Sequence, residues 1–212
     1  METKQRFETP PTEKGEATRR RILEVAAKAF AESGYDGTSL NDVIRDAGAT
    51  KGGFYFHFPS KEALALEVLR DKRERWAGRV LAATMRHERA IDQLRAIPFA
   101  LCELYEQDPA ATAIGRICQD LSQDPALLPQ IAPQFTTWYD LTASVIRKAQ
   151  EQGDIPADVD PVATARVLVA SFIGVEMVSG MMSGLSDLRD RVNEYVELFG
   201  RLAINASSDT TS

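Results

Sequence analysis

Apolar residues recur every three or four positions along most of the chain, which is the spacing of one face of an α-helix. No segment alternates apolar and polar residues over a length that would indicate a β-strand. The sequence therefore predicts an all-α fold with about nine helices. The expected helices span approximately residues 16–33, 40–47, 51–57, 61–86, 91–107, 109–122, 129–152, 161–183 and 186–205.

Short polar segments that contain Gly, Pro or Ser separate these helices. Gly34 and Gly48 suit the left-handed position that ends the first and second helices. Ser39 and Thr50 precede the second and third helices, where a hydroxyl can cap free backbone N–H groups. Pro98 is expected to kink the fifth helix, because proline lacks the N–H that a helix interior uses.

The helix lengths divide the chain into parts. Residues 1–15 are polar and lack an apolar period, so they predict a flexible arm, and residues 206–212 predict a flexible tail. Two short helices joined by a tight turn, with the first helix as support, are typical of a three-helix helix-turn-helix domain. We therefore expect a DNA-binding domain over residues 16–60 and a larger helical domain over residues 61–205.

On this interpretation, residues 51–57 form the recognition helix, whose N-terminal residues face the major groove. Gly52 and Gly53 weaken a helix by about 1 kcal/mol each relative to alanine, but they let the backbone approach DNA closely. Lys51 is long enough to reach a base edge or a phosphate. Thr50 and the free N–H groups of the first turn can donate to phosphate.

The aromatic residues of this helix separate by helical position. Phe54 and Phe58 are four residues apart and are predicted to pack against the first two helices. Tyr55 is expected to face the groove, where it can contact a sugar, a thymine methyl group or a phosphate. His57 either contacts phosphate or faces water, and the pattern leaves Phe56 unassigned.

The charge distribution supports an anionic partner for the N-terminal third. The net charge at pH 7 is −6 overall. Residues 1–77 hold 14 Lys/Arg and 13 Asp/Glu, net +1, whereas residues 78–212 hold 11 and 18, net −7. An anion such as DNA would therefore meet the N-terminal part, although ordinary solvated helix faces would carry the same charges.

The sequence offers little for catalysis. His57 and His87 are the only histidines, and no Gly-rich phosphate loop or catalytic-triad signature is present. Cys102 and Cys118 lack partners at metal-ligand spacing, so they are expected to be buried structural residues, and a redox-sensing role stays open. We expect no enzymatic activity, no metal and no cofactor.

The chain is expected to be cytoplasmic, with no membrane partner. Its first residues are polar and charged, unlike a secretory signal. The longest uncharged apolar run, residues 167–175, is too short to span a bilayer. Two cysteines are too few for a disulfide framework, which favours a reducing compartment.

The segment from Ile22 to Leu69, ILEVAAKAFAESGYDGTSLNDVIRDAGATKGGFYFHFPSKEALALEVL, resembles the DNA-binding domain of TetR-family transcriptional regulators. The matching features are Phe-x-x-x-Gly-Tyr, a Thr-Ser pair, and Thr-Lys-Gly-x-Phe-Tyr-x-His-Phe followed by Ser-Lys-Glu. The resemblance implies a homodimeric repressor that binds a palindromic operator in double-stranded DNA and is released by a small-molecule effector. With the helical pattern, it assigns DNA contacts to Thr38, Ser39, Thr50, Lys51, Gly52, Gly53, Tyr55, His57 and Lys61.

Residues 135–161 and 172–199 are similar to the C-terminal part of γ-butyrolactone-receptor-like members. Those members place a tryptophan in the ligand cavity, and Trp138 falls at that position; the alternative is an ordinary core tryptophan. The similarity implies a ligand-binding and dimerisation domain and a small, mostly apolar effector, with a γ-butyrolactone-like molecule as one form of it. Candidate cavity residues are Phe99, Leu101, Leu104, Ile114, Ile117, Phe135, Trp138, Leu141 and Phe172, with Gln119 or Tyr139 as polar partners.

Residues 162–182 are apolar on nearly all sides, which predicts a helix that is buried all round. Together with the last helix, it can pair with the same helices of a second subunit, or the two helices can fill the chain's own core. A dimer would set two recognition helices against palindromic half-sites. A regulator without a ligand, or an activator, fits the same residues. The expected dimerisation residues are Phe172, Met177, Val192, Tyr195 and Phe199.

Overall fold

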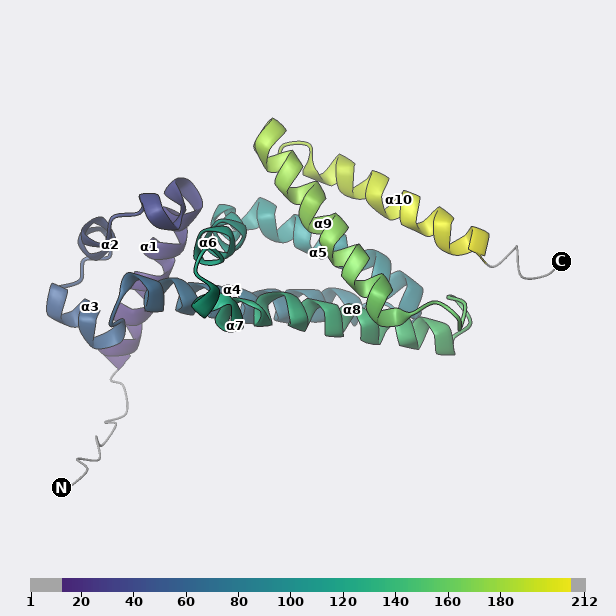
Figure 1. The fold of residues 1–212 in the computed structure, drawn as a ribbon, viewed down its shortest axis with the longest axis horizontal. Coiled ribbons are helices and arrows are strands. Elements are labelled where there is room, and N and C mark those ends of the chain that lie inside the picture. Colours follow the sequence, from purple (N-terminus) through teal and green to yellow (C-terminus); the bar gives the residue numbers. More distant parts are fainter. Residues whose placement is uncertain (1–12, 207–212) are drawn as a thin grey trace, which may run out of the picture.

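The computed structural model describes residues 13–206, which form helices and no β-strand (Figure 1). Over this range there are ten α-helices and two 3-10 helices. One of the ten, α7 (Leu128–Ile131), is only four residues long, so the predicted class and number of helices are confirmed. Most of the predicted arm, residues 1–12, and residues 207–212 of the predicted tail lie outside the described residues.

Four helices form the N-terminal end of the fold: α1 (Glu13–Gly37), α2 (Leu40–Asp46), α3 (Lys51–His57) and α4 (Lys61–Thr84). Gly34 has a φ of +74° inside α1, so the helical path breaks where the sequence predicted its end. Because glycine has no Cβ, it adopts this left-handed conformation without strain. The short helices α2 and α3 lie beside α1 at one end of the molecule (Figure 1).

The remaining helices build the larger part, and two proline-containing segments differ from the sequence prediction. Helix α5 spans the predicted residues and contains Pro98, where the expected kink stays a prediction. The helix expected over residues 109–122 begins as a 3-10 turn, and the one expected over residues 129–152 divides before Pro133, whose missing N–H interrupts the ladder. The elements are α5 (Ala90–Gln107), η1 (Pro109–Thr112), α6 (Ala113–Leu121), η2 (Pro125–Leu127), α7, α8 (Pro133–Glu151), α9 (Pro161–Ser183) and α10 (Leu188–Ala206).

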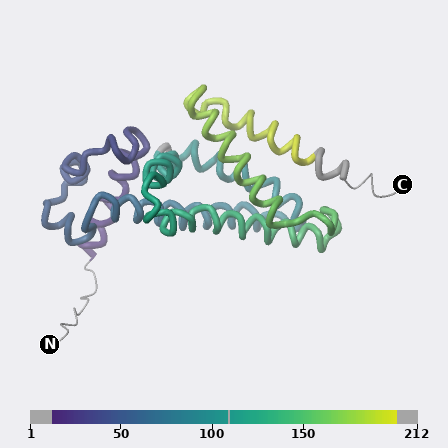
Figure 2. The backbone as a smooth tube through the Cα atoms, in the orientation of Figure 1, coloured from purple at the N-terminus to yellow at the C-terminus, as the bar shows by residue number. Residues whose placement is uncertain are grey.

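Helix α4 connects the two main hydrophobic cores. Leu64 and Val68 pack with α1–α3 in the first core, which also includes Ile117 of α6. Further along α4, Trp76 and Val80 belong to the second core, with side chains from α5, α9 and α10. Figure 2 shows this helix leaving the N-terminal end and entering the larger part. Because α4 and α6 tie both parts together, the division after residue 60 stays a prediction.

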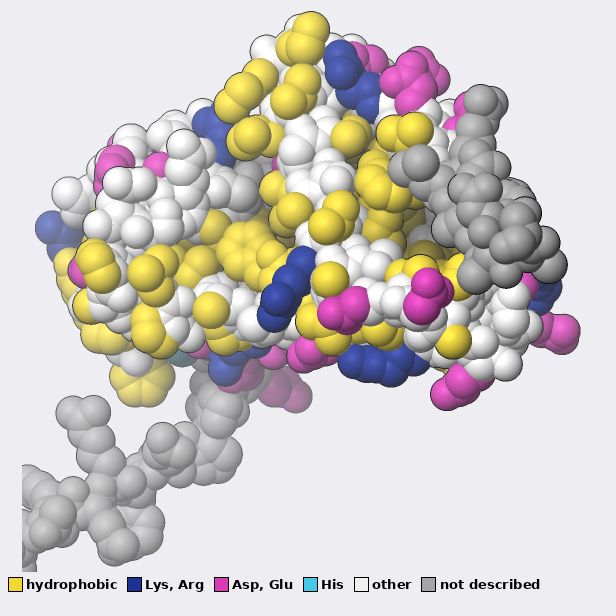
Figure 3. Space-filling model, turned by 45° about the vertical axis from the view of Figure 1, so that its right-hand side comes forward, with side chains coloured by type: hydrophobic (Ala, Val, Ile, Leu, Met, Phe, Trp, Pro, Cys, Tyr) yellow, Lys and Arg dark blue, Asp and Glu magenta, His cyan; other side chains and the backbone are white. Residues whose placement is uncertain are grey.

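Helix α9 is not buried all round in a single chain, which corrects the expectation drawn from its composition. Val167 is 56% exposed and Met181 is 76% exposed, although the opposite side, including Phe172, is buried. Its length and mean hydropathy of 1.6 would also suit a membrane span, with 22% of the apolar window buried. It packs against α8 and α10, and its other face carries exposed apolar side chains. Figure 3 shows hydrophobic side chains gathered on one face of the molecule around hollowed regions.

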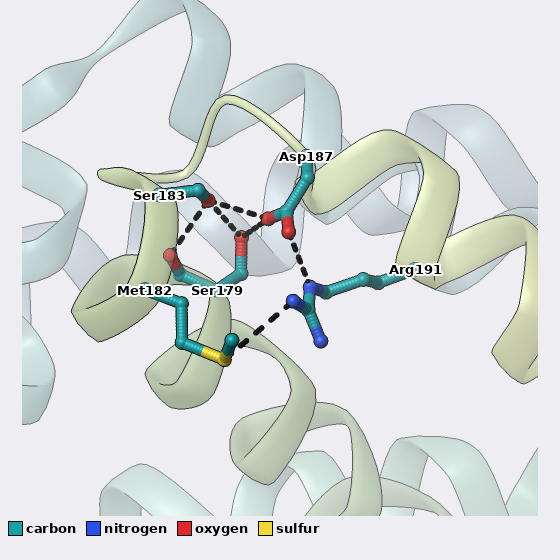
Figure 4. A network of polar contacts seen from close by, with 5 residues as sticks. All are labelled: Ser179, Met182, Ser183, Asp187 and Arg191. Atoms are coloured by element: carbon teal, nitrogen blue, oxygen red, sulfur yellow. Dashed lines mark hydrogen bonds and ion pairs between the residues drawn. The ribbon is translucent and has the colours of Figure 1, made fainter.

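A polar network fixes the turn between α9 and α10 (Figure 4). The hydroxyls of Ser179 and Ser183 each donate to Oδ1 of Asp187 at 2.5 Å. Nε of Arg191 donates to Oδ2 of the same carboxylate at 2.7 Å. These three hydrogen bonds stabilise the charged form, so they lower the pKa of Asp187 to about 2. The two helices are therefore held as one hairpin.

Candidate DNA-binding surface and effector cavity

The first turn of α3 explains its two glycines separately. Oγ1 of Thr50 accepts a hydrogen bond from the backbone N–H of Gly53 at 3.0 Å and caps the helix. A Cβ on Gly53 would lie 3.1 Å from that oxygen, whereas a Cβ on Gly52 would meet nothing within 4 Å. Gly53 therefore makes room for the cap, and Gly52 leaves the exposed surface of the helix clear for a partner.

The aromatic residues of α3 divide between two faces, as the spacing predicted for three of them. Phe54 and Phe58 are 0% and 1% exposed, and their ring centroids lie 5.7 Å apart in the first core. Tyr55 is 53% exposed. Phe56, which the sequence left unassigned, is 84% exposed, and its ring meets the ring of His57 edge-on at 5.1 Å. The exposed face of α3 therefore carries the rings of Tyr55 and Phe56, and the opposite face is held in the core by Phe54 and Phe58.

The hydroxyls before α2 differ in availability. Thr38 is buried, and its hydroxyl donates to the backbone oxygen of Gly34 at 2.6 Å. Ser39 is exposed at the start of α2 and makes no side-chain capping hydrogen bond. Thr38 and Ser39 were both candidates for a DNA contact at the start of α2, but only Ser39 presents an exposed side chain. Thr38 instead ties the turn to the end of α1.

Two lysines, Lys51 and Lys61, lie on either side of the exposed face of α3 along the chain. Lys51 is exposed at the first position of α3. Nζ of Lys61 donates to the backbone oxygen of Asp36 at 3.3 Å and lies 4.6 Å from the ring centroid of Tyr35. Burial lowers the pKa of Lys61, and the nearby acidic side chain of Asp36 opposes that shift. Lys61 is therefore held in place at the start of α4, beside the end of α1.

The end of α1 is attached to α6 by polar contacts. The backbone N–H of Tyr35 donates to Oδ2 of Asp120 at 2.7 Å. Nη1 of Arg116, one turn earlier on α6, donates to the backbone oxygen of Glu32 at 3.1 Å. A Cβ on Gly34 would lie 3.2 Å from the Asp120 carboxylate. Helix α6 thus holds the last turn of α1 through its backbone.

Two cavities lie in the larger part, and we call them the apolar cavity and the polar cavity. The apolar cavity has a volume of about 330 Å³ and lies among α4, α5, α8, α9 and α10. This volume is at the lower end of the range for small-molecule sites, roughly 300–1,000 Å³. Its walls include Val80, Ile91, Leu94, Leu101, Trp138, Leu141, Leu168, Phe172 and Phe199.

The polar cavity has a volume of about 1,220 Å³ and lies between the end of α1, α6, α8 and α9. Its charged wall residues are Asp36, Arg116, Asp120 and Glu176. Burial raises the pKa of Glu176. This cavity therefore borders the same α1–α6 contact that fixes the DNA-binding end.

The predicted effector residues are distributed over both cavities. Trp138 and Phe172 border both, Leu141 borders the apolar cavity, and Ile114 and Phe135 border the polar cavity. Neither cavity is lined by Phe99 or by Ile117, which is fully buried in the first core. Of the suggested polar partners, Gln119 borders the polar cavity and Tyr139 borders neither.

Sequence reasoning missed the tryptophan pair that separates the cavities. Trp76 and Trp138 have ring centroids 4.9 Å apart, and Trp76 also meets Tyr105 edge-on at 5.7 Å. Trp76 borders both cavities, and its buried Nε1 has no hydrogen-bond partner among the described residues. Trp76 lies on α4 about four helical turns after Lys61, and no local sequence motif there predicts its contact with Trp138. Trp138 is consequently both a cavity wall and part of the second core.

The two cysteines are buried and unpaired. Burial raises the pKa of the Cys102 thiol to about 11 and that of the Cys118 thiol to about 12. Both groups are therefore protonated near neutral pH, the form that reacts slowly with oxidants. Over residues 13–206, no cluster of three His, Cys, Asp or Glu side chains is placed to hold a metal ion.

The predicted dimerisation residues do not share one exposed face. Phe172, Val192 and Tyr195 are buried in the second core, so in this chain they have little surface to offer a partner. Met177 is 48% exposed on α9, and Phe199 is half-buried on α10. Around Met177, the exposed apolar residues of α9 recur at helical spacing: Val167, Val178, Met181 and Met182.

Comparison with known proteins places these features in a family. The model of bacterial regulatory proteins of the tetR family matches residues 22–68, and the model of the tetracyclin repressor-like C-terminal domain matches residues 77–204. The A-factor receptor protein of Streptomyces griseus is 31% identical over 182 residues, 84% of this chain and 60% of that protein. The chain therefore spans less than two thirds of this relative's length.

Two solved structures are similar over most of both chains. CprB, a TetR family protein from S. coelicolor A3(2), is 29% identical with a TM-score of 0.70, covering 89% of this chain and 88% of that one. TylP, a TetR regulator from Streptomyces fradiae, is 28% identical with a TM-score of 0.69, covering 89% and 87%. These relatives are transcriptional regulators and not enzymes. The chain belongs to the TetR family of DNA-binding transcriptional regulators.

Proposed function

We propose that the protein is a homodimeric repressor that binds a palindromic operator in double-stranded DNA and is released by a small, mostly apolar effector. The observation that carries this proposal is the division of α3 into two faces. Phe54 and Phe58 anchor the helix from behind, and Tyr55 and Phe56 stand on the exposed side. A short helix supported in this way suits insertion into a major groove.

The contacts to DNA sort into two kinds. Lys51, Gly52 and Tyr55 face the groove, where they reach base edges and the thymine methyl group. Ser39, Thr50, His57 and Lys61 contact the phosphates on either side and fix the register of the helix. Phe56 joins the proposed surface because of its exposure, and it packs on the sugar-phosphate backbone. Thr38 acts from behind by positioning Ser39.

The second copy that a palindrome requires would cover α9. Its exposed residues Val167, Val178 and Met181 form an apolar stripe, and Leu198 of α10 is 56% exposed. Burial of each such side chain removes apolar surface from water, worth roughly 25 cal/mol per Å². A two-fold interface places each stripe against its own copy, so one apolar face satisfies both subunits. The hairpin held by Asp187 keeps α9 and α10 in one orientation for this contact.

The effector would occupy the apolar cavity against Trp138. One similar protein, the A-factor receptor, is named as a receptor. We propose that this chain likewise binds a small molecule, and that it does so in the cytoplasm. The molecule is γ-butyrolactone-like or has another mostly apolar structure. Binding releases DNA if the effector prefers the conformation whose recognition helices are wrongly spaced. Helix α4 joins the apolar cavity to the DNA-binding end. The α6–α1 contact borders the polar cavity, which shares Trp76 and Trp138 with the apolar one.

The experiment is selection of DNA fragments bound by the purified protein from the genome of its source organism. The proposal predicts that bound fragments share an inverted repeat beside a small set of genes. Loss of transcription from those genes on deletion of the protein would identify an activator instead. Bound fragments without any shared repeat would contradict operator recognition by a symmetric dimer.

A further inference from the structure

Among the described residues that line the apolar cavity, Arg95 is the charged one, and no Asp or Glu side chain is present. Asp92, which contacts Arg95, is not a lining residue. The neighbouring polar cavity, by contrast, carries three carboxylates and one guanidinium. A cationic effector would therefore find no counter-charge in the apolar cavity, whereas a group that accepts hydrogen bonds would find a donor.

Arg95 lies on α5 near α10, at one end of the cavity. Its side chain is 45% exposed, and its Nη1 contacts Oδ1 of Asp92 at a long 3.5 Å. Its Nη2 would be 3.9 Å from a Cβ on Gly200 of α10. Among the described residues, this long contact engages few of the five guanidinium N–H groups, so the fork remains able to hold an incoming acceptor.

The other polar groups on the wall are donors or already engaged. The hydroxyl of Tyr195 donates to the backbone oxygen of Leu168 at 2.9 Å. The hydroxyl of Thr137 donates to the backbone oxygen of Pro133 at 2.9 Å. The indole N–H of Trp76 can only donate, but it is buried rather than exposed to the cavity. Among the described wall residues, apart from the other threonine hydroxyls, the polar side chain left to engage a ligand is therefore Arg95, a donor.

The position of Arg95 also sets an orientation. Leu101, beside the tryptophan pair in the second core, follows Arg95 by six positions on α5. At a rise of 1.5 Å per residue, six positions correspond to about 9 Å along the helix. A ligand with its polar group at Arg95 can therefore extend an apolar body along α5 as far as Trp76 and Trp138.

We propose that Arg95 binds the polar end of the effector, and that the effector is an amphipathic molecule whose apolar body ends in a hydrogen-bond acceptor. A carboxylate matches the guanidinium fork in both charge and geometry, and a lactone or ketone oxygen supplies the same acceptor without the charge. This inference rests on the proposed function, because it takes the apolar cavity as the effector site.

The test is isothermal titration calorimetry with three probes of ten carbon atoms each: decanoic acid, γ-decalactone and 1-decanol. Each is titrated into the wild-type protein, Arg95→Gln, Arg95→Lys and Arg86→Gln. Arg86 is exposed and lines neither cavity, so its replacement controls for the loss of one surface charge. Circular dichroism confirms that each variant is folded before titration.

The proposal predicts that decanoic acid or γ-decalactone binds more tightly than 1-decanol, and that Arg95→Gln weakens the preferred probe about tenfold or more, as expected for loss of a hydrogen bond to a charged group. Arg95→Lys should restore part of the affinity for decanoic acid. Preference for γ-decalactone would identify a neutral acceptor, and preference for decanoic acid an anionic one. Equal affinities in wild type and Arg95→Gln, or no binding of any probe, would overturn the proposal.

Operator binding by the wild-type protein without a probe is measured in parallel. If DNA is not bound but probe affinity depends on Arg95, the proposed function fails and the cavity assignment stands. If DNA is bound but no probe affinity depends on Arg95, the DNA-binding function stands and the assignment of Arg95 to the effector site fails.

Discussion

The backbone N–H of Tyr35 at the end of α1 donates a 2.7 Å hydrogen bond to Oδ2 of Asp120 on α6. Residues on the same short helix, including Ile114 and Gln119, border the polar cavity. The bond therefore joins a cavity wall to the helix that supports the recognition helix. A carboxylate acceptor makes this bond stronger than a neutral one. A ligand that displaced α6 would pull on the end of α1.

Replacement of Asp120 by alanine should weaken this connection. The Tyr35 N–H would lose its partner, which costs about 1–3 kcal/mol in the free energy of unfolding if the group stays buried. Asp120→Asn should keep part of the stability, because an amide oxygen can still accept. Thermal unfolding measures the effect, with Asp140→Asn on the exposed side of α8 as a control. Equal stability of Asp120→Ala and wild type would show that α6 does not hold α1 through this bond.

The two glycines of α3 should respond differently to alanine. Gly52→Ala adds a methyl group in open space, so the fold should gain about 0.5–1 kcal/mol of helix propensity while operator affinity falls. Gly53→Ala crowds Oγ1 of Thr50, so the capping energy that it loses, about 1 kcal/mol, should cancel the same gain in helix propensity and leave the stability near that of the wild type. Chemical denaturation and DNA binding are measured for both. Unchanged operator affinity for Gly52→Ala would mean that this face does not meet DNA.

The exposed stripe of α9 should control the oligomeric state. Met181→Glu places a charge at the centre of the proposed two-fold contact, where it would lose water without gaining a counter-charge. We expect monomers by light scattering at concentrations where the wild type is dimeric. Leu81→Glu is the matched control, since Leu81 is 52% exposed on α4, outside this stripe. A dimer that persists in Met181→Glu would place the interface elsewhere.

Much of the fold follows from local signals in the sequence. The cap at Thr50 and the left-handed Gly34 were predictable, because each depends on residues within a few positions. The start of α6 and the division before Pro133 were missed, because a proline at the start of a helix gives the same signal whether a 3-10 turn precedes the helix or not. Pro109 therefore marked where a helical segment begins but not that it begins as a 3-10 turn, and Pro133 was not recognised as the start of a separate helix.

The site was less predictable, because burial depends on distant parts of the chain. An apolar residue on α9 gives the same pattern whether it packs on its own chain, as Phe172 does, or is exposed, as Met181 is. The same holds for Val192, which the sequence assigned to the dimer and the structure buries in the second core. The contact of Trp76 with Trp138 joins residues far apart in the chain, so no local motif reports it.

The cysteines should be inert towards thiol reagents in the folded protein. At pH 8 both thiols are protonated and buried, so reaction with a disulfide reagent should be much slower than in the unfolded chain. A rapid reaction of either cysteine in the native state would reopen a redox-sensing role.

The same thiols should contribute to a loss of stability at alkaline pH. The folded-state pKa of Cys118, about 12, lies above its ordinary value of 9.0. Between these two pH values the unfolded chain releases the thiol proton and the folded chain keeps it, so the free energy of unfolding falls as pH rises. The contribution of Cys118 to stability is therefore complete below pH 9.0 and is lost as pH approaches 12. The free energy of unfolding is measured by denaturation over this range. Cys118→Ala should show a shallower decline than wild type, and an identical decline would contradict the assignment.

The central claim is that α3 reads DNA in a symmetric dimer. Its most direct test is fluorescence anisotropy with a labelled palindrome recovered by fragment selection, titrated with wild type, Tyr55→Ala and Leu128→Ala. Tyr55 and Leu128 are both exposed, but Leu128 lies on α7. We predict two protomers per palindrome, a loss of affinity of about tenfold or more for Tyr55→Ala, and wild-type affinity for Leu128→Ala. Equal affinity of Tyr55→Ala and wild type would contradict the claim.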